Sequence, residues 1–139
     1  IMYEIPKGLF KAVIFTPFGE LPDSTNPLMK KYRAAQEKFM PKERWGIFFS
    51  AGFLFVEPMV EALKRCGRDL TADNFVKAME SLKDFQGIGP RISFGPDKRQ
   101  GARSVFLGKC VEGGRAVAIS DWMASDIDVE EVIEENYGR

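Results

Sequence analysis

The chain has 139 residues, 45% of them hydrophobic and 29% charged, which is typical of a globular chain with one core. Its 20 basic and 20 acidic residues balance, so nothing at the level of the whole chain indicates a nucleic-acid partner. The absence of histidine excludes Ser-His-Asp and Cys-His catalysis and removes the commonest metal ligand. The longest apolar run, residues 47–56, falls well short of the roughly 20 residues that a membrane-spanning helix needs. We therefore expect no enzyme, no cofactor and no metal site.

The N-terminal part of the sequence predicts a strand, a loop and an amphipathic helix. Residues Lys11–Phe18 (KAVIFTPF) are β-branched and aromatic, which favours a buried strand that ends at a loop. Residues Gly19–Asn26 have the composition of a loop, and the last three, 24–26, are candidate N-caps. A proline in the first turn and one apolar stripe then predict a helix over Pro27–Phe39.

Two further helices are expected. The segment Trp45–Cys66 is apolar almost all round in its first half and amphipathic in its second, which predicts a long, half-buried helix that ends at Gly67. Pro58 lies inside this segment and is expected to kink or locally break the helix. Thr71 is positioned to cap a shorter helix over Ala72–Leu82.

The remainder of the body predicts turns and β-structure. Phe85–Pro90 (FQGIGP) is interpreted as a turn, because it lacks the third glycine and the strand-then-helix setting of a phosphate-binding loop. A short strand over Arg91–Phe94 and a turn over Gly95–Gly101 follow. Ser104–Val111 and Arg115–Ile119 are β-prone runs joined by a short glycine-rich loop, which predicts a β-hairpin.

The composition changes after the hairpin. Between Asp121 and Glu135 there are seven carboxylates and no basic residue, so the neutral total conceals a basic body and an acidic tail. We therefore divide the chain into a body, residues 1–122, and an acidic tail, residues 123–139. Apolar residues spaced along one face favour a short helix in the tail.

Two sets of side chains are candidates for special roles. Cys66 and Cys110 are either two buried free thiols or a disulfide that joins a helix end to a strand, and a disulfide would fit an oxidising compartment. Four phenylalanines of the long helix either pack in the core or line a ligand pocket. They are Phe48, Phe49, Phe53 and Phe55.

The order of several short motifs resembles a known family. In chain order they are GF at 52–53, EALKRCG at 61–67, LT at 70–71, FQG at 85–87, ISF at 92–94, PD at 96–97 and GG at 113–114. Over roughly residues 8–122, their order and spacing resemble the C-terminal third of the branched-chain amino-acid type of periplasmic binding protein. The chain departs from the family pattern in having Phe53 where tyrosine is usual, Pro58 within the helix and the acidic tail.

This resemblance implies an α/β fold that is the C-terminal portion of a two-lobed, type I periplasmic-binding-protein-like fold and is incomplete as a lobe. In the family, two lobes close on a small molecule such as an amino acid or a small organic acid, and an ABC permease is the partner. The resemblance also implies a periplasmic or extracellular location. One form of such a protein is a full-length parent that is anchored to the membrane by a lipid. Thr16 and Phe18 would lie near a lobe crossing, where Thr16 could hydrogen-bond a ligand and Phe18 could pack on it. A piece of this kind is expected to self-associate to cover its apolar surface.

Two other functions are alternatives to import. The same fold serves as the ligand-sensing domain of receptors and amide-sensor-like regulators, and gene neighbourhood would separate sensing from transport. A stand-alone enzyme that uses carboxylates is disfavoured, because no pair of carboxylates has a framing motif.

Overall fold

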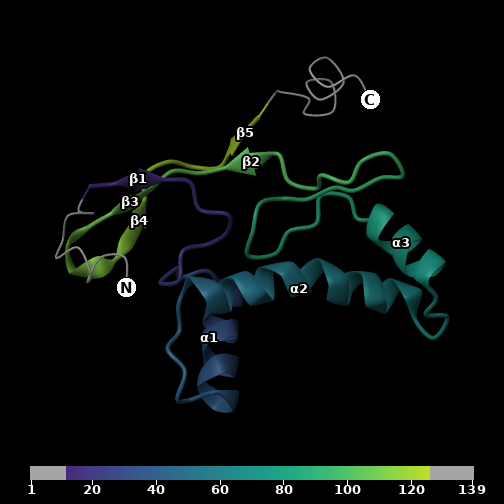
Figure 1. Cartoon of the computed structure of the whole chain (residues 1–139), viewed down its shortest axis with the longest axis horizontal. Helices are drawn as coiled ribbons and strands as arrows, with labels where there is room; N and C mark the ends of the chain where they lie inside the picture. Colours follow the sequence, from purple (N-terminus) through teal and green to yellow (C-terminus); the bar gives the residue numbers. More distant parts are fainter. Residues whose placement is uncertain (1–11, 126–139) are drawn as a thin grey trace.

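The computed structural model describes residues 12–125, which form helices and small antiparallel sheets (Figure 1). In chain order the elements are β1 (Ile14–Phe15), α1 (Pro27–Phe39), α2 (Ile47–Cys66), α3 (Ala72–Glu80), β2 (Ser104–Val105), β3 (Gly108–Cys110), the 3-10 turn Glu112–Gly114, β4 (Ala116–Ala118) and β5 (Met123–Ala124).

Helix α2 is the longest element of the described chain. Helix α1 meets it near its N-terminal end, and α3 lies beside its C-terminal end (Figure 1). The strands lie on the opposite side of α2 from α1 in this view. The segment 16–26 connects β1 to α1, and the segment 81–103 connects α3 to β2. The mixed α/β content that the sequence predicts is confirmed.

Local capping signals fix the helix boundaries. The Oδ1 atom of Asn26 accepts a hydrogen bond from the Leu28 N–H at 2.9 Å, and α1 spans the predicted residues. Thr71 Oγ1 accepts from the Asn74 N–H at 3.2 Å at the start of α3. Gly67 ends α2 with a φ of 61°, a left-handed conformation that glycine adopts without strain.

Two details of the helices differ from the prediction. Helix α2 is continuous through Pro58, so the expected local break does not occur. Helix α3 ends at Glu80 instead of Leu82, since the Leu82 N–H bonds to the Met79 carbonyl and its side chain turns into the core, fully buried.

The strands are shorter than the sequence predicts, and one is new. A three-stranded sheet has the order β1-β3-β4, and β2 pairs with β5 in a separate antiparallel ladder. The predicted run Ser104–Val111 is therefore two strands, not one. It is interrupted where the Leu107 N–H bonds to Ser120 Oγ at 2.8 Å and Phe106 packs edge-on against Trp122, with ring centroids 4.8 Å apart.

Two other predicted strands are also shorter in the structure than in the prediction. Of the predicted strand Lys11–Phe18, residues 12–18 are described, and among them Ile14 and Phe15 form the strand. It does not continue through Pro17, which has no N–H to donate. The expected strand Arg91–Phe94 is reduced to bridges at Ile92, which pairs with Phe85 and Ala102. Strand β5 begins at residue 123, the start of the predicted tail, and the expected tail helix lies outside the described residues.

The core of the described part is small. Seven apolar side chains are buried: Leu21, Met29, Ala62, Ala78, Leu82, Ile88 and Phe106. Eighteen large apolar side chains of the described part are exposed, and six of them lie on α2. None of the helices described between residues 12 and 125 is long and apolar enough to cross a membrane.

The Thr71 cap yields a first prediction. We expect Thr71→Ala to lower the free energy of unfolding by about 1 kcal/mol, because the Asn74 N–H loses its partner. Thr71→Ser, which keeps the hydroxyl, should retain most of that stability. Equal urea midpoints for the two variants would show that the cap contributes nothing.

Candidate functional site

The carboxylate of Glu57, in the middle of α2, holds the helical region together. Its Oε1 atom accepts a hydrogen bond from the Tyr32 hydroxyl of α1 at 2.6 Å. Its Oε2 atom accepts from the backbone N–H of Ile88 at 2.8 Å. One side chain therefore ties α1 and the turn Phe85–Pro90 to the same point of α2.

The turn approaches α2 closely because it carries glycine. A Cβ atom at Gly87 would lie 1.9 Å from Glu57 Oε2, and one at Gly89 would lie 3.0 Å from Leu54 Cδ1. Gly19, on the segment after β1, meets the same leucine: a Cβ there would lie 2.3 Å from Leu54 Cδ1. The N–H of Glu20 donates to the Ile88 carbonyl at 2.7 Å, which joins this segment to the turn.

Tyr32 is held between Glu57 and an aromatic ring. Its own ring stacks on Phe53 with centroids 4.2 Å apart and an interplanar angle of 5°. Burial, together with the hydrogen bond to the Glu57 carboxylate and its negative charge, raises the pKa of Tyr32 well above its ordinary value. The phenol is therefore a fixed donor at neutral pH.

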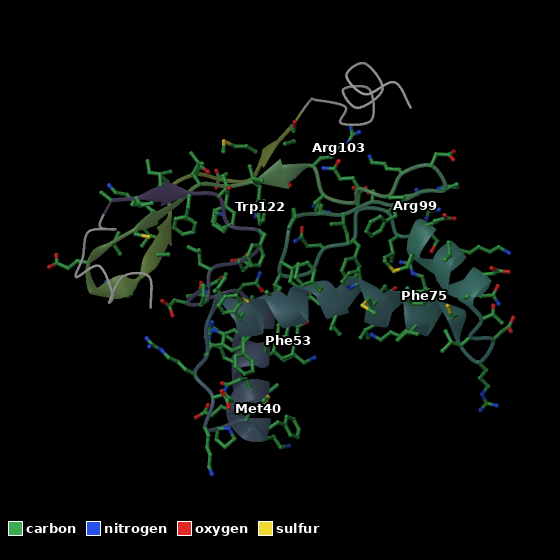
Figure 2. The ribbon with its side chains drawn as sticks, viewed as in Figure 1. Met40, Phe53, Phe75, Arg99, Arg103 and Trp122 are labelled. Atoms are coloured by element: carbon green, nitrogen blue, oxygen red, sulfur yellow. The ribbon has the colours of Figure 1, made fainter. Side chains whose placement is uncertain are left out.

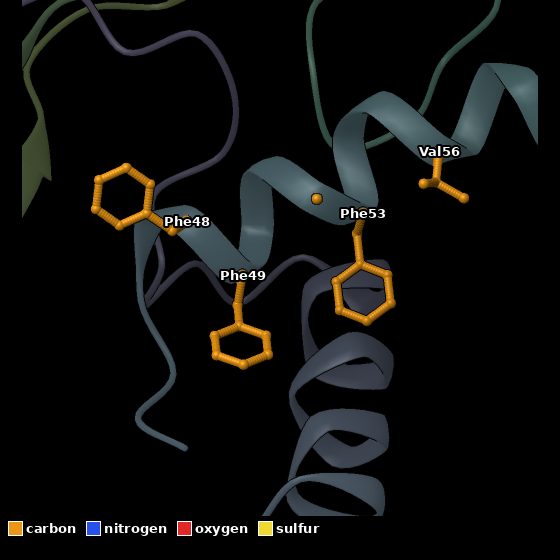
Figure 3. A pocket seen from close by; sticks show the side chains of 5 residues that line it. Phe48, Phe49, Phe53 and Val56 are labelled. Atoms are coloured by element: carbon orange, nitrogen blue, oxygen red, sulfur yellow. The ribbon is translucent and has the colours of Figure 1, made fainter.

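An apolar groove lies on α2 next to α1. It has a volume of about 420 Å³ and is lined by Phe48, Phe49, Gly52, Phe53 and Val56 (Figure 3). Phe53 points toward α1, whereas Phe48 points away and is 87% exposed (Figures 2 and 3). The four phenylalanines therefore divide: Phe49 and Phe53 are half-buried, and Phe48 and Phe55 are exposed.

Both predicted ligand residues lie on the segment that follows β1, and Phe18 forms an aromatic surface with Phe55 of α2. Thr16 is exposed, and Phe18 is 50% exposed. The ring of Phe18 faces that of Phe55, with centroids 6.5 Å apart and an interplanar angle of 16°. Phe18 thus meets α2, but it lies outside the lining of the groove. The ligand-binding role of both residues stays a prediction.

Helix α2 makes polar contacts on the side that packs against the described chain and also exposes a set of apolar side chains. The side that faces the turn Phe85–Pro90 and α3 carries Glu57 and Arg65, and Arg65 donates to the Ser81 carbonyl at 2.9 Å. The other side carries an exposed apolar stripe, whose members are Phe48, Phe55, Val56, Met59, Val60 and Leu63. A stripe of this size on a soluble helix is typical of a buried interface.

The cysteines are free thiols in the structure. Cys66 closes α2 and Cys110 lies in β3, at opposite ends of the molecule (Figure 1). A disulfide between them is therefore not formed here. Within residues 12–125, no group of three or more histidine, cysteine, aspartate or glutamate side chains is arranged to hold a metal.

Sequence reasoning missed the role of Glu57. The available signal was a carboxylate directly after the apolar half of a helix and directly before a proline. Its partners, Tyr32 and Ile88, are 25 and 31 residues away in sequence, so the spacing of residues along the chain cannot indicate them.

Comparison with known proteins identifies the family. Residues 5–115 match the sequence profile of the family described as "Periplasmic binding protein". The chain therefore belongs to the periplasmic binding protein family. A search of curated proteins found no match.

Solved structures agree on the fold. A branched-chain amino acid ABC transporter from Thermus thermophilus with bound valine superposes with a TM-score of 0.74 and 12% identity, over 99% of this chain and 38% of that one. A fatty acid ABC transporter substrate-binding protein from Thermomonospora curvata gives 0.71 and 23%, over 94% and 33%. A possible leucine/isoleucine/valine-binding protein from Rhodopirellula baltica SH 1 gives 0.70 and 20%, over 81% and 30%. The chain thus spans about a third of the length of these structures and has part of a type I periplasmic binding protein fold, as predicted.

The close approach at Gly87 can be tested directly. We expect Gly87→Ala to lower the free energy of unfolding by about 2–4 kcal/mol, because a Cβ would displace the Glu57 carboxylate from both donors. Gly95→Ala is the matched control, since its nearest neighbour, Lys83 Nζ, would lie at 3.6 Å. Similar small losses of stability for the two variants would contradict the role of Glu57.

The raised pKa of Tyr32 predicts an alkaline effect. The folded state favours the neutral phenol, so its contribution to stability is complete below pH 10, the ordinary tyrosine pKa, and is lost as the pH rises above it. Thermal melts between pH 8 and pH 11 should therefore show a steeper loss of stability for the wild type than for Tyr32→Phe. Parallel curves would contradict the prediction.

Proposed function

We propose that this chain is the C-terminal portion of an extracytoplasmic solute-binding receptor that captures a small molecule for ABC-type import. The family match over residues 5–115 carries the proposal. Family membership argues for ligand capture without catalysis, for a periplasmic or extracellular location and for an ABC permease as partner.

The exposed apolar stripe of α2 supports this proposal. The structures that the chain resembles are about three times longer than the chain. A receptor built from this chain and the remaining two-thirds of such a fold would have apolar surface available to cover the stripe of α2. The stripe would then be interior in the whole receptor, while the described part alone leaves it in water.

The surface around Phe18 supports the proposed ligand class. Phe18 stacks on Phe55 and is itself 50% exposed, and Thr16 supplies an exposed hydroxyl on the same segment as Phe18. Such a surface suits a molecule with an apolar body and one hydrogen-bonding group, such as an amino acid or a small organic acid. The resemblance to structures described with bound valine and as fatty-acid-binding is consistent with an apolar ligand.

The proposal is tested by thermal melting of the full-length protein against amino acids, fatty acids and small organic acids. A ligand that binds only the folded state raises the melting temperature by mass action, by an amount that grows with its concentration. Phe18→Ala should reduce the shift, and Leu70→Ala, on an exposed side chain away from the aromatic surface, should leave it unchanged. No shift with any compound would contradict import and favour a sensor that acts through a partner protein.

Self-association of the 139-residue chain is the expected behaviour when the stripe is left uncovered. Light scattering should give a mass above that of the monomer, and Leu63→Asp, within the stripe, should return it toward the monomer. Leu70→Asp is the control, because Leu70 is 57% exposed and lies outside the stripe. A monomeric wild-type chain would contradict this prediction.

A further inference from the structure

Residues 91–103 form a basic loop to which the proposed function assigns no role. One acidic residue, Asp97, stands in it against four basic residues, which are Arg91, Lys98, Arg99 and Arg103. The three arginines are exposed, and Lys98 is half-buried. Figure 2 shows Arg103 beside strand β2 and Arg99 nearer to α3, so the positive charge is spread along the loop.

The two arms of the basic loop run antiparallel and close together. Ile92 pairs with Ala102, and the Ser93 N–H donates to the Gly101 carbonyl at 3.0 Å. One residue further along this register, Arg91 and Arg103 are neighbours across the two arms. Like charges at such positions repel each other, so an anion placed beside them is stabilising.

Contacts with α3 and the residue that follows its end hold the basic loop in place. The Phe94 N–H donates to the Leu82 carbonyl at 3.0 Å. Arg99 Nη1 lies 2.8 Å from Glu80 Oε1, at the end of α3. A surface fixed in this way requires little ordering when a partner docks on it.

Part of the positive charge of the loop is not neutralised by its surroundings. Glu80 pairs with Arg99, whereas the side chains of Arg91 and Lys98 make no hydrogen bond or ion pair within residues 12–125. Both charges are therefore available to an anionic partner.

The carboxylates of the acidic tail begin beside this loop. Ser125, at the end of the described part, donates its N–H to the Arg103 carbonyl at 2.7 Å, one residue beyond the β2–β5 ladder. Six carboxylates and no basic residue follow within residues 126–135. Ten residues can extend over about 35 Å, whereas an arm of about six residues is about 20 Å long. The tail is therefore long enough to reach every basic residue of the loop.

We propose that the basic loop is the docking surface of the acidic tail of the same chain, whose carboxylates pair with Arg91, Lys98 and Arg103. Charge complementarity and the start of the tail beside Arg103 favour this occupant over a separate molecule. Because the tail is attached next to the loop, its effective concentration there is about that of a short flexible linker, in the millimolar range. Each exposed ion pair is weak, but several act together. The docked tail ties the end of β5 to the loop that α3 holds, and this role does not depend on the proposed function.

Zero-length crosslinking of the full-length protein with a carbodiimide tests this proposal. The reagent joins a carboxylate to a lysine amine where the two are in contact, and mass spectrometry maps the products. We expect Lys98 to be joined to the segment 126–135. Lys30, which is exposed on α1 and lies away from the loop, should not be joined to it (Figure 1). Raising the salt from about 20 mM to about 500 mM should lower the Lys98 yield about fivefold or more, because exposed charges are screened.

Two arginine variants provide the matched comparison. Arg91→Gln should lower the yield of the Lys98 product about two- to fivefold, since one of the charges that hold the tail is lost. Arg68→Gln is the control, because Arg68 is exposed and lies outside the loop. A mixture of isotope-labelled and unlabelled protein separates docking within one chain from docking on a second copy. The proposal is overturned by the absence of the Lys98 product at low salt, by equal yields for the two variants, or by products that join mainly labelled to unlabelled chains.

Discussion

The carboxylate of Glu57 is the contact on which the rest of the described structure depends. It directly follows the apolar first half of α2, and both of its oxygens bond to groups distant in sequence: the Tyr32 hydroxyl and the Ile88 N–H. A half-buried carboxylate is costly unless it is hydrogen-bonded, so these two donors fix which side of α2 faces inward. Gly87 is required beside it, because any side chain there would occupy the space of the carboxylate.

The orientation set by Glu57 has a consequence for the opposite side of the helix. With Glu57 and Arg65 turned toward the turn and α3, the residues three and four positions apart on the other side form the apolar stripe. The described part buries only a few side chains of its own, so it resembles one part of a larger core. This agrees with a family match in which the chain spans about a third of the related structures.

The sequence predicted those features that local chemistry determines. Asn26 followed by proline, Thr71 and Gly67 set helix ends through contacts with residues at most four positions away, and these boundaries are confirmed. The family resemblance was also visible, because it depends on the order of such local signals. Features that depend on distant contacts were missed or misplaced. The run 104–111 divides into two strands because of its contacts with Ser120 and Trp122. The local sequence pattern indicates neither strand β5 nor the partners of Glu57.

The central claim is that the stripe of α2 is interior in the whole receptor. Hydroxyl-radical footprinting of the full-length protein, read by mass spectrometry, tests it most directly. In the described part, Met59 and Leu63 are 46% and 42% exposed, and Leu70 is 57% exposed. If the rest of the protein covered none of them, the three side chains would be labelled to a similar extent after correction for side-chain reactivity. We predict strong labelling of Leu70 and little labelling of Met59 and Leu63. Labelling of the stripe in proportion to these exposures would contradict the account.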